Sequence, residues 1–345
     1  MRSGARESLT LGGQTLTIGF LNPSSDTDRQ SLLDLHRAVF GSSADARWFA
    51  WKYQDGPGIG VGLWDGETMI AFCGGTGRGF LECGNAARIL QIGDVMVDPR
   101  WRGLLTRNGP FFRVCDYLYS RAIGTGTAHR AGFGFPNLRH MRLAERSGLA
   151  WHATDVHQLS WSTGEARGAS GDWTIRADWI DPSEHVEIGI TPIGKVAIDQ
   201  AWANMRGSPH AGRWVIGDRG WDHLRWRYLA RPDRGYRFAV LRRRWRRAAL
   251  GVLVFSRETP EHWIDWIGPP ESITLACRMA RRLLAAQGLA SMHAWCSVLL
   301  ARILADTDPI EDKIIAAIGV PRTSMLPGAA TDYPFWLMGG DTDFL

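Results

Sequence analysis

A short stretch in the first third of the chain combines residue types that bind phosphate. The strand-like run Ile92–Val97 is followed directly by the basic, glycine-containing loop Asp98–Gly103. Main-chain N–H groups where a loop leads into a helix attract anions, and the helix dipole favours negative charge there. The arginines of the loop can add charge-assisted hydrogen bonds to phosphate oxygens. The spacing therefore predicts a pyrophosphate site, and the alternative is a surface turn whose arginines are solvated.

Three side chains near this stretch are candidates for proton transfer. A general base assists any reaction in which the attacking group must lose a proton. Asp94, within the strand-like run, is the first candidate base, and its alternative role is to pair with a nearby arginine or to cap a turn. His129 and His140, on either side of the next predicted strand, could act as a base or a proton relay. The alternative for both histidines is an ordinary surface position.

Neither a covalent intermediate nor a metal site is predicted. No cysteine or serine stands in a recognisable nucleophile motif, which disfavours a covalent enzyme intermediate. The cysteines number five and none forms a CxxC pair, so neither a zinc site nor a disulfide framework is expected. If the reaction passes through a tetrahedral intermediate, main-chain N–H groups around Val97 could stabilise its oxyanion.

The candidate residues fall within a regular succession of predicted strands and helices. Apolar residues recur at helical spacing, and strand-like segments separate the helices. Pro110 suits the first turn of a helix, and Gly148 suits the end of one. The order predicts an α/β unit around a mixed sheet. The predicted strands are Leu16–Leu21, Val61–Trp64, Met69–Cys73, Ile89–Val97, Ala131–Phe135 and Val156–Trp161, and the predicted helices are Asp28–Phe40, Pro110–Ala122 and Leu138–Ser147, with a short helix that carries Trp48, Trp51 and Tyr53.

The same landmarks recur in the second half of the chain. Trp51-Lys52-Tyr53 returns as Trp226-Arg227-Tyr228, and a proline follows each triplet after three residues. Asp94 has a counterpart in Asp265, within the predicted strand His262–Ile267. The offset is 175 residues for the triplets and 171 for the aspartates. Landmarks that recur at nearly one offset indicate a tandem duplication of one α/β unit.

Two further features extend the repeat and locate its join. Gly148 and Gly319 are also separated by 171 residues, which predicts that each of them ends a helix. The stretch Ser162–Gly171 is rich in Gly, Ala and Ser and lacks large apolar residues, as linkers do. We therefore expect one domain at residues 1–162 and a second at residues 172–345.

The loop and its surroundings resemble the GNAT superfamily of acyl-CoA-dependent N-acyltransferases. The loop of that superfamily has the form Arg/Gln-x-x-Gly-x-Gly/Ala. Arg100, Gly103 and Leu105 stand at its three fixed positions, and two of them agree. The strands and helices on either side of the loop also follow the order of the superfamily. The resemblance covers about Leu16 to Trp161 and, more weakly, Trp173 to Leu345.

The resemblance implies a fold, a donor and a set of binding residues. It implies two tandem GNAT-like α/β units, with acyl-CoA or the phosphopantetheine of an acyl carrier protein as co-substrate. The splayed strand end would receive the pantetheine arm, and the loop would receive the pyrophosphate. Asn137 would bind the pantetheine, cap its helix, or do both. The residues assigned to the donor in this way are Val95, Met96, Val97, Arg100, Arg102, Gly103, Leu104, Leu105, Thr106 and Asn137.

Some positions depart from the pattern of the superfamily. Leu105 replaces a small residue where the main chain approaches phosphate, and Asn108-Gly109-Pro110 predicts a late helix start. A carrier-held donor is therefore an alternative to free CoA. Ala144 stands where the superfamily often has a proton-donating tyrosine, so no general acid is assigned. These departures support a second hypothesis, in which a catalytically silent protein of this fold binds acyl-CoA or a protein partner.

The second half of the chain lacks an equivalent donor loop. Its corresponding stretch, Ile267–Pro270, contains two prolines without N–H groups and no arginine. The helix predicted after it, Ile273–Leu284, keeps a continuous apolar face and should still fold. We therefore expect the second unit to be a degenerate copy that shapes the acceptor side.

Two charged segments have open interpretations. Arg242–Arg247 holds five arginines and one tryptophan at a predicted hairpin turn. A solvated turn is its first interpretation, and docking of an acidic carrier protein or anionic polymer is the alternative. Nucleic acid is not expected, because few aromatic residues alternate with the charges. The tail Trp336–Asp343 predicts a strand and an acidic turn, which is either a polar chain end or an attraction for a cationic amine.

The composition limits the class of protein. The chain has 345 residues, 45% hydrophobic and 22% charged, with a formal charge of +5, which is typical of a globular protein with two domains. No apolar run is long enough for a membrane span and none resembles a signal peptide, so a cytoplasmic location is expected. The predicted activity is acyl transfer from a thioester to a small-molecule or peptide amine, by direct attack in a ternary complex.

Overall fold

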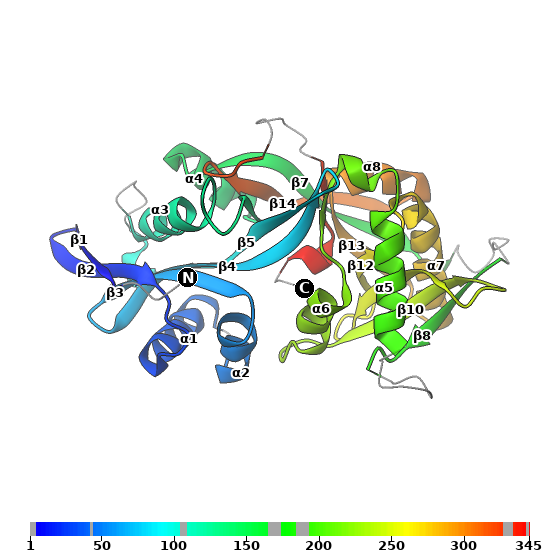
Figure 1. Ribbon diagram of the computed structural model, residues 1–345, viewed down its shortest axis with the longest axis horizontal. Helices are drawn as coiled ribbons and strands as arrows, with labels where there is room; N and C mark the ends of the chain where they lie inside the picture. Colours follow the sequence, from blue (N-terminus) through cyan, green and yellow to red (C-terminus); the bar gives the residue numbers. More distant parts are fainter. Residues whose placement is uncertain are drawn as a thin grey trace. The chain divides into compact units, whose positions relative to one another are not determined.

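The structure consists of two compact units, whose elements are labelled in Figure 1. The computed structural model describes residues 5–41, 44–103, 109–164, 174–183, 193–326, 334–342 and 345. Each unit combines segments that are distant in sequence. As far as the structure describes them, the first unit is Met1–Gly79, Ala87–Ala153 and Ala317–Thr331, and the second is Phe80–Ala86, Thr154–Ala316 and Asp332–Leu345.

The first unit is built on a mixed sheet. Its strands lie in the order β1-β2-β3-β4-β5-β6. Hairpins join β1 to β2 and β3 to β4, whereas β5 and β6 are parallel because a helix connects them. The second half of β14 continues the sheet through the pair Gly319–Gly134. The strand bounds are β1 Glu7–Leu11, β2 Gln14–Phe20, β3 Gly58–Asp65, β4 Thr68–Glu82, β5 Asn85–Val97, β6 Ala131–Gly134, β7 Ala150–Ser162 and β14 Glu311–Pro321.

Helices cover both faces of this sheet. In Figure 1, α1 and α2 lie on one side of the strands, and α3 and α4 lie on the other. Side chains of Ser25 and Asn137 accept N–H groups at the starts of α1 and α4, and left-handed Gly41 and Gly148 end the same two helices. The helix bounds are α1 Asp26–Phe40, α2 Ala46–Phe49, which continues as the π-helical turn η1 Ala50–Gln54, α3 Pro110–Ala122 and α4 Leu138–Ser147.

The second unit repeats this architecture. Its sheet runs in the order β7-β13-β12-β11-β10-β8, with β12 and β13 parallel. A short strand, β9, pairs with β15 and with the end of β4. The bounds are β8 Ile175–Ile180, β9 Val215–Gly217, β10 Tyr236–Arg243, β11 Ala249–Ser256, β12 His262–Ile267, β13 Ser291–Ser297 and β15 Phe335–Trp336, and the helices are α5 Ile193–Arg206, α6 Trp221–Leu224 with the π-helical turn η5 Arg225–Leu229, α7 Ile273–Ala286 and α8 Val298–Leu304.

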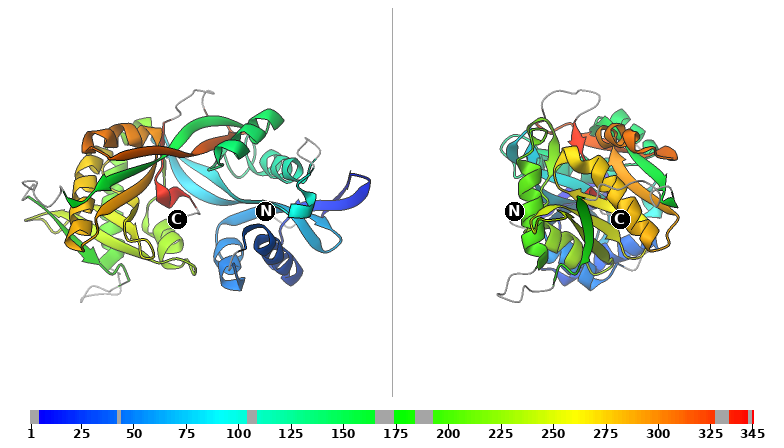
Figure 2. Two further views of the ribbon diagram at one scale, coloured as in Figure 1. Left: turned by 180° about the vertical axis from the view of Figure 1, so that it is seen from behind. Right: turned by 90° about the vertical axis from the view of Figure 1, so that its right-hand side faces the viewer.

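The closing strand of each repeat takes part in the sheet of the other unit. β7 ends the first repeat, yet its residues Val156–Ser162 pair with β13 of the second unit. β14 ends the second repeat, yet it pairs with β6 of the first unit. Both strands are visible in Figure 2. The repeats thus exchange their closing strands, which explains why the compact units are discontinuous in sequence.

Most of the predicted elements are confirmed. The chain is a mixed α/β protein of two tandem units, and the helices Pro110–Ala122 and Leu138–Ser147 have the predicted bounds. The prediction that Gly319 ends a helix is wrong, because Gly319 lies inside β14. The short α8 instead leads to Asp308, whose φ of 53° is left-handed. A different residue therefore ends the second copy of this helix.

The two charged segments differ from each other in exposure. Arg242–Arg247 spans the turn between β10 and β11, as predicted, and Trp245 within it is 89% exposed. The tail is not a polar chain end, because Phe335–Thr342 is buried throughout. Asp341 in the tail pairs with the buried Arg219, which removes it as an attraction for an amine. Asp343 lies outside the described residues.

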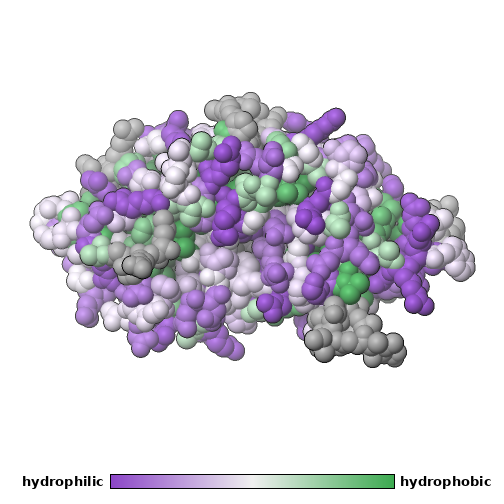
Figure 3. Space-filling model, viewed as in Figure 1, coloured by the Kyte–Doolittle hydropathy of each residue, from purple (hydrophilic) through white to green (hydrophobic). Residues whose placement is uncertain are grey.

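Figure 3 shows the hydropathy of one face of the molecule. Hydrophilic side chains cover most of the face in Figure 3, and apolar side chains form small patches on it. Apolar residues instead gather in a large buried cluster within each unit. In the part of the chain that the structure describes, no helix is long and apolar enough to cross a membrane.

Candidate active site

The described part of the predicted site, Ile92–Gly103, begins where two parallel strands stop pairing. The last pair between β5 and β6 is Ile92–Gly134, although β5 continues to Val97. Among the strands that the structure describes, none pairs with that side of β5 beyond Ile92. An unpaired strand edge offers main-chain N–H and C=O groups to an extended ligand.

Asp94 interrupts β5 just beyond the last pair. Its φ is 51°, in the left-handed region that few residues other than glycine adopt. Aspartate tolerates this conformation better than bulky residues, but it remains a source of strain. The strand is therefore bent at the residue whose carboxylate was predicted to act as the base.

The carboxylate of Asp94 binds two neighbours from η1. Its Oδ2 accepts a hydrogen bond of 2.6 Å from the Tyr53 hydroxyl and lies 2.7 Å from the Lys52 ammonium. The Lys52 side chain is 1% exposed, and its ammonium lies 5.7 Å and 5.8 Å from the ring centroids of Trp48 and Tyr53. Cation–π attraction at these distances helps to compensate for the loss of water around the ammonium. The ion pair and the two rings hold the carboxylate in one position.

One oxygen of Asp94 remains open to a further ligand. Lys52 and Tyr53 both bind Oδ2, and no hydrogen bond within the described residues reaches Oδ1. The Asp94 side chain is 12% exposed. Oδ1 can therefore accept a proton or a hydrogen bond from a molecule that enters from solvent.

Glycine is required beside the Tyr53 hydroxyl. A Cβ atom added to Gly74 of β4 would lie 2.3 Å from the Tyr53 oxygen, well inside any real contact. The same atom would lie 3.4 Å from the carbonyl oxygen of Gly93. Gly74 thus allows β4, β5 and Tyr53 to approach one another closely next to Asp94.

The arginines of the predicted donor loop have internal partners. Asp98 accepts hydrogen bonds from the N–H, Nε and Nη2 of Arg100, at 2.9, 3.0 and 2.8 Å, and begins the 3-10 turn η2 Pro99–Trp101. Arg102 donates from Nε to the Val97 carbonyl over 3.0 Å. Both arginines are exposed, so a phosphate could bind them only by adding to these contacts or replacing them.

Asp98 provides a pH-dependent test of this loop. Hydrogen bonds from the Arg100 side chain hold the pKa of Asp98 below its ordinary value of 3.8. Because the pKa of Asp98 is lower in the folded state, its pairing with Arg100 contributes fully to the free energy of unfolding above about pH 3.8. That contribution is lost as the pH falls through the lowered pKa. Arg100→Gln should move the Asp98 midpoint, followed by NMR of its carboxyl carbon, part of the way back towards 3.8.

The matched control is Arg47→Gln, which removes a different exposed arginine next to an aspartate. That change should leave the Asp98 midpoint where it is. If Arg100→Gln also left it unchanged, the Arg100 side chain would not be what stabilises the carboxylate.

The two candidate histidines occupy different environments. His129 is 4% exposed, its Nδ1 lies 3.0 Å from the Ala122 carbonyl, and burial lowers the pKa of its ring. His140 is exposed in the first turn of α4. Within the described residues, no hydrogen bond or ion pair joins either histidine to Asp94. The structure therefore does not bring the three predicted catalytic residues into one cluster.

The remaining predicted donor residues are located only in part. Val95, Met96 and Val97 lie on the β5 segment beyond the last pair with β6. Asn137 is exposed, and its Oδ1 accepts the His140 N–H over 2.9 Å, so it caps α4. Leu104, Leu105 and Thr106 lie outside the described residues.

Lys52 and Tyr53 were not identified as site residues from the sequence. The sequence did mark both residues, because they belong to the Trp51-Lys52-Tyr53 triplet that recurs as Trp226-Arg227-Tyr228. The repeat located the triplet and Asp94 independently, but it did not indicate that they touch. Their contact depends on how η1 packs against β5, which no local pattern encodes.

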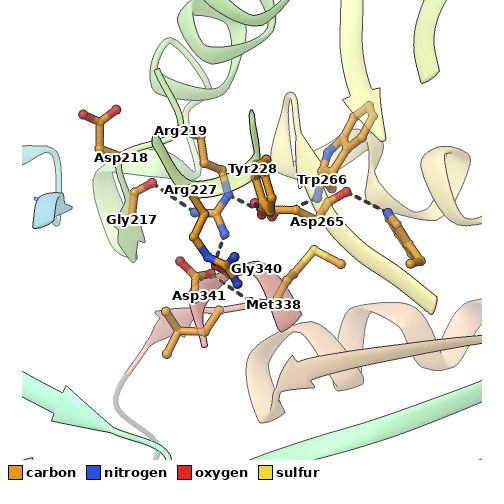
Figure 4. Close-up of polar contacts among 12 residues, drawn as sticks. Gly217, Asp218, Arg219, Arg227, Tyr228, Asp265, Trp266, Met338, Gly340 and Asp341 are labelled. Carbon is orange, nitrogen blue, oxygen red and sulfur yellow. Dashed lines mark hydrogen bonds and ion pairs between the residues drawn. The ribbon is translucent and has the colours of Figure 1, made fainter. Parts of the chain in front are cut away.

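The second unit contains the same pair of residues in a different state. Tyr228 donates to Oδ2 of Asp265 over 3.0 Å, and Arg219 binds Oδ1 of Asp265 over 3.0 Å and Asp341 over 2.5 Å (Figure 4). Burial raises the pKa of Asp265. Burial alone would lower the pKa of Arg219, but the two carboxylates raise it. Here the carboxylate is sealed inside the unit, with Tyr228 only 3% exposed.

Comparisons with known proteins identify the fold. No family model matches the chain, and no curated protein matches it. A solved structure from Enterococcus faecalis, a conserved protein of unknown function described as a probable N-acyltransferase, is similar to it with a TM-score of 0.65 and 13% identity. The similarity covers 88% of this chain and 72% of that one.

Two other solved structures are also similar to this chain. A GCN5-related N-acetyltransferase from Kribbella flavida gives a TM-score of 0.59 at 14% identity, covering 88% of this chain and 70% of that one. One from Anabaena variabilis gives 0.61 at 12% identity, covering 88% and 72%. The chain therefore has a GNAT-type fold over most of its length, as its sequence predicted.

Proposed function

We propose that the protein is an N-acyltransferase that moves an acyl group from a thioester to an amine in its first unit. The observation that carries the proposal is the strand pair β5–β6, which stops pairing at Ile92–Gly134 and leads to an Asp94 carboxylate with one open oxygen. The GNAT-type fold supports the same assignment, because the similar structures are named as N-acyltransferases or N-acetyltransferases.

The donor is an acyl thioester of CoA or of a carrier-held phosphopantetheine. Its amide-bearing arm pairs with the unpaired edge of Val95–Val97, beside β6. Arg100 and Arg102 lie on the loop that follows, where the pyrophosphate of CoA would bind beside Gly103. A phosphate there would compete with Asp98 for Arg100, so the loop changes its hydrogen bonds when the donor binds.

The acyl group moves by direct attack of the amine on the thioester carbonyl. The nitrogen forms a bond to the carbonyl carbon, the C–S bond breaks, and the leaving thiolate takes a proton from water, so that the hydroxide formed takes up the proton that the base has removed from the nitrogen. Asp94 removes the proton that the attacking nitrogen loses, and its Oδ1 is the atom that receives it. Lys52 and Tyr53 act as positioning residues, because both hold Oδ2.

The base is assigned to Asp94 rather than to a histidine because Asp94 lies just beyond the last β5–β6 pair, where the donor is proposed to bind. His129 is 4% exposed, and one ring nitrogen lies against a main-chain carbonyl. His140 is exposed on α4, the helix that follows β6, and is retained as a proton relay to solvent. The acceptor is a small-molecule or peptide amine.

A silent binding protein is the second candidate function. Two observations favour it. Ala144 of α4 supplies no hydroxyl, and the buried Lys52 neutralises the charge of Asp94. A silent protein would bind acyl-CoA or a partner without releasing thiol.

Thiol release from acetyl-CoA distinguishes the two functions. Addition of a panel of primary amines to the protein and acetyl-CoA should increase the rate of free thiol formation, measured with a chromogenic disulfide. The acylated amine should appear in equal amount by mass spectrometry. Donor binding without thiol release from acetyl-CoA, longer acyl-CoAs or an acyl carrier protein would instead support the silent protein.

A further inference from the structure

In the second unit, as in the first, two parallel strands stop pairing before they end. We call the gap beyond the last pair the opening, and the opening of the second unit is filled. Its parallel pair β12–β13 ends at Trp263–Ala294, and Trp263 corresponds to Ile92 at the offset that relates Asp265 to Asp94. In both units, pairing therefore stops two residues before the aspartate that binds a tyrosine hydroxyl. The two units differ in whether a chain segment lies in that opening.

A segment of the chain itself lies between the diverging ends of β12 and β13. The Ser297 N–H at the end of β13 donates to the Leu337 carbonyl over 3.0 Å, and Met338 forms an antiparallel bridge with Cys296. The Ser297 hydroxyl also donates to the Phe335 carbonyl over 2.5 Å. The first two are main-chain contacts of the kind that an added strand would make, and the third is a side-chain contact to the same segment.

The same segment reaches the β12 side of the opening. A Cβ on Gly339 would lie 3.4 Å from the Ile264 carbonyl oxygen. A Cβ on Gly340 would lie 2.0 Å from the Tyr228 hydroxyl and 2.9 Å from the Asp265 carboxylate. Glycine at position 340 therefore allows the main chain to lie directly on the tyrosine–aspartate pair (Figure 4).

The segment is fixed by a buried ion pair. Asp341 accepts hydrogen bonds on Oδ2 from the Met338 N–H over 3.0 Å and from Arg219 over 2.5 Å. Arg219 also holds Asp265, so one guanidinium joins the segment to β12. The segment Phe335–Thr342 is buried at every position.

We propose that Phe335–Thr342 is an internal ligand of the second unit, bound where an extended amide-bearing chain would enter between β12 and β13. It holds that opening closed to the pantetheine arm of a donor, so the chain takes up donor in the first unit alone. The ligand class of the second opening, once vacated, is an extended amide chain such as pantetheine. This last statement rests on the proposed function of the first unit.

Gly340→Ala tests the proposal, because its methyl group would meet the Tyr228 hydroxyl. Hydrogen exchange at the Ser297 and Val215 amides, which donate to Leu337 and Pro334, should become roughly tenfold faster or more. Excess pantetheine should then slow exchange at Ser297 again. Exchange at Ala317, which donates to Pro136 in the first unit, should not change.

Two further variants keep the result interpretable. Gly212→Ala, in the same unit with nothing within 4 Å of the added methyl, should behave like the parent chain. Gly340→Ala with Tyr228→Phe removes the nearer oxygen that the methyl meets and leaves the contact of 2.9 Å with the Asp265 carboxylate, so it should slow exchange at Ser297 part of the way back towards that of the parent chain.

Two outcomes would overturn the proposal. Unchanged exchange at Ser297 in Gly340→Ala would mean that the segment does not occupy the opening, and failure of pantetheine to slow that exchange would mean that the opening has no such ligand. Both results are measured as hydrogen exchange at an amide of the second unit. Acetyl-CoA turnover by the parent chain is measured separately, so failure of the proposed function would be recognised on its own.

Discussion

Replacing Asp94 by asparagine is expected to lower kcat/KM for amine acylation by roughly 10²–10⁴. The amide keeps the size and shape of the side chain, but its oxygen no longer accepts the proton of the attacking amine. The Kd for acetyl-CoA, measured by calorimetry, should change little, because Asp94 is assigned to the proton and not to the donor. Full activity in Asp94→Asn would remove Asp94 as the base.

Two companion variants separate chemistry from folding. Asp94→Asn also leaves the buried Lys52 without its carboxylate, so thermal unfolding must be followed in parallel. Tyr53→Phe removes one hydrogen bond to Oδ2, worth about 1 kcal/mol, and should lower the rate far less than Asp94→Asn does. Asp116→Asn, at an exposed position of α3, should alter neither rate nor stability.

Removal of Arg219 is expected to have the largest effect on stability. Arg219→Met keeps an apolar chain of similar length but leaves the carboxylates of Asp265 and Asp341, 4% and 0% exposed, without their shared guanidinium. Breaking a buried ion pair in this way costs about 3–5 kcal/mol, which corresponds to a fall of roughly 10 °C in the unfolding temperature. Calorimetry of the full chain measures it.

The control for Arg219 is an arginine at the surface of the same unit. Arg176 pairs with Asp178 over 3.3 Å, and their side chains are 50% and 47% exposed. Arg176→Met should change the free energy of unfolding by less than about 1 kcal/mol. If Arg219→Met were equally harmless, the second unit would not depend on its buried ion pairs, and the account of the tail would fail with it.

The fold was predictable where the signal was local or repeated. Helical spacing and capping residues predicted α3 and α4 to the residue, and the recurring triplet and aspartate predicted two tandem units. The exchange of β7 and β14 between the units was not predictable, because the pairing partner of a strand is set by tertiary packing and not by its own sequence. Gly319 was misplaced for the same reason.

The site was predictable in outline only. Asp94 and the strand end Val95–Val97 followed from element order and resemblance, whereas the partners Lys52 and Tyr53 follow from a contact between distant segments. The tail was misjudged because acidic residues are usually exposed. Asp341 is buried only because Arg219, from a loop far away in sequence, meets it there.

The most direct test of the account is hydrogen exchange of the parent chain during titration with acetyl-CoA. We predict one bound equivalent, with slowed exchange at the amides of Val95–Val97 in the first unit. Exchange at Trp266–Gly268, the stretch of the second unit that matches Val95–Val97 at the offset of the aspartates, should not respond. Equal protection of both stretches with two equivalents bound, or no binding by acetyl-CoA and longer acyl-CoAs, would contradict the assignment of the CoA donor site to the first unit.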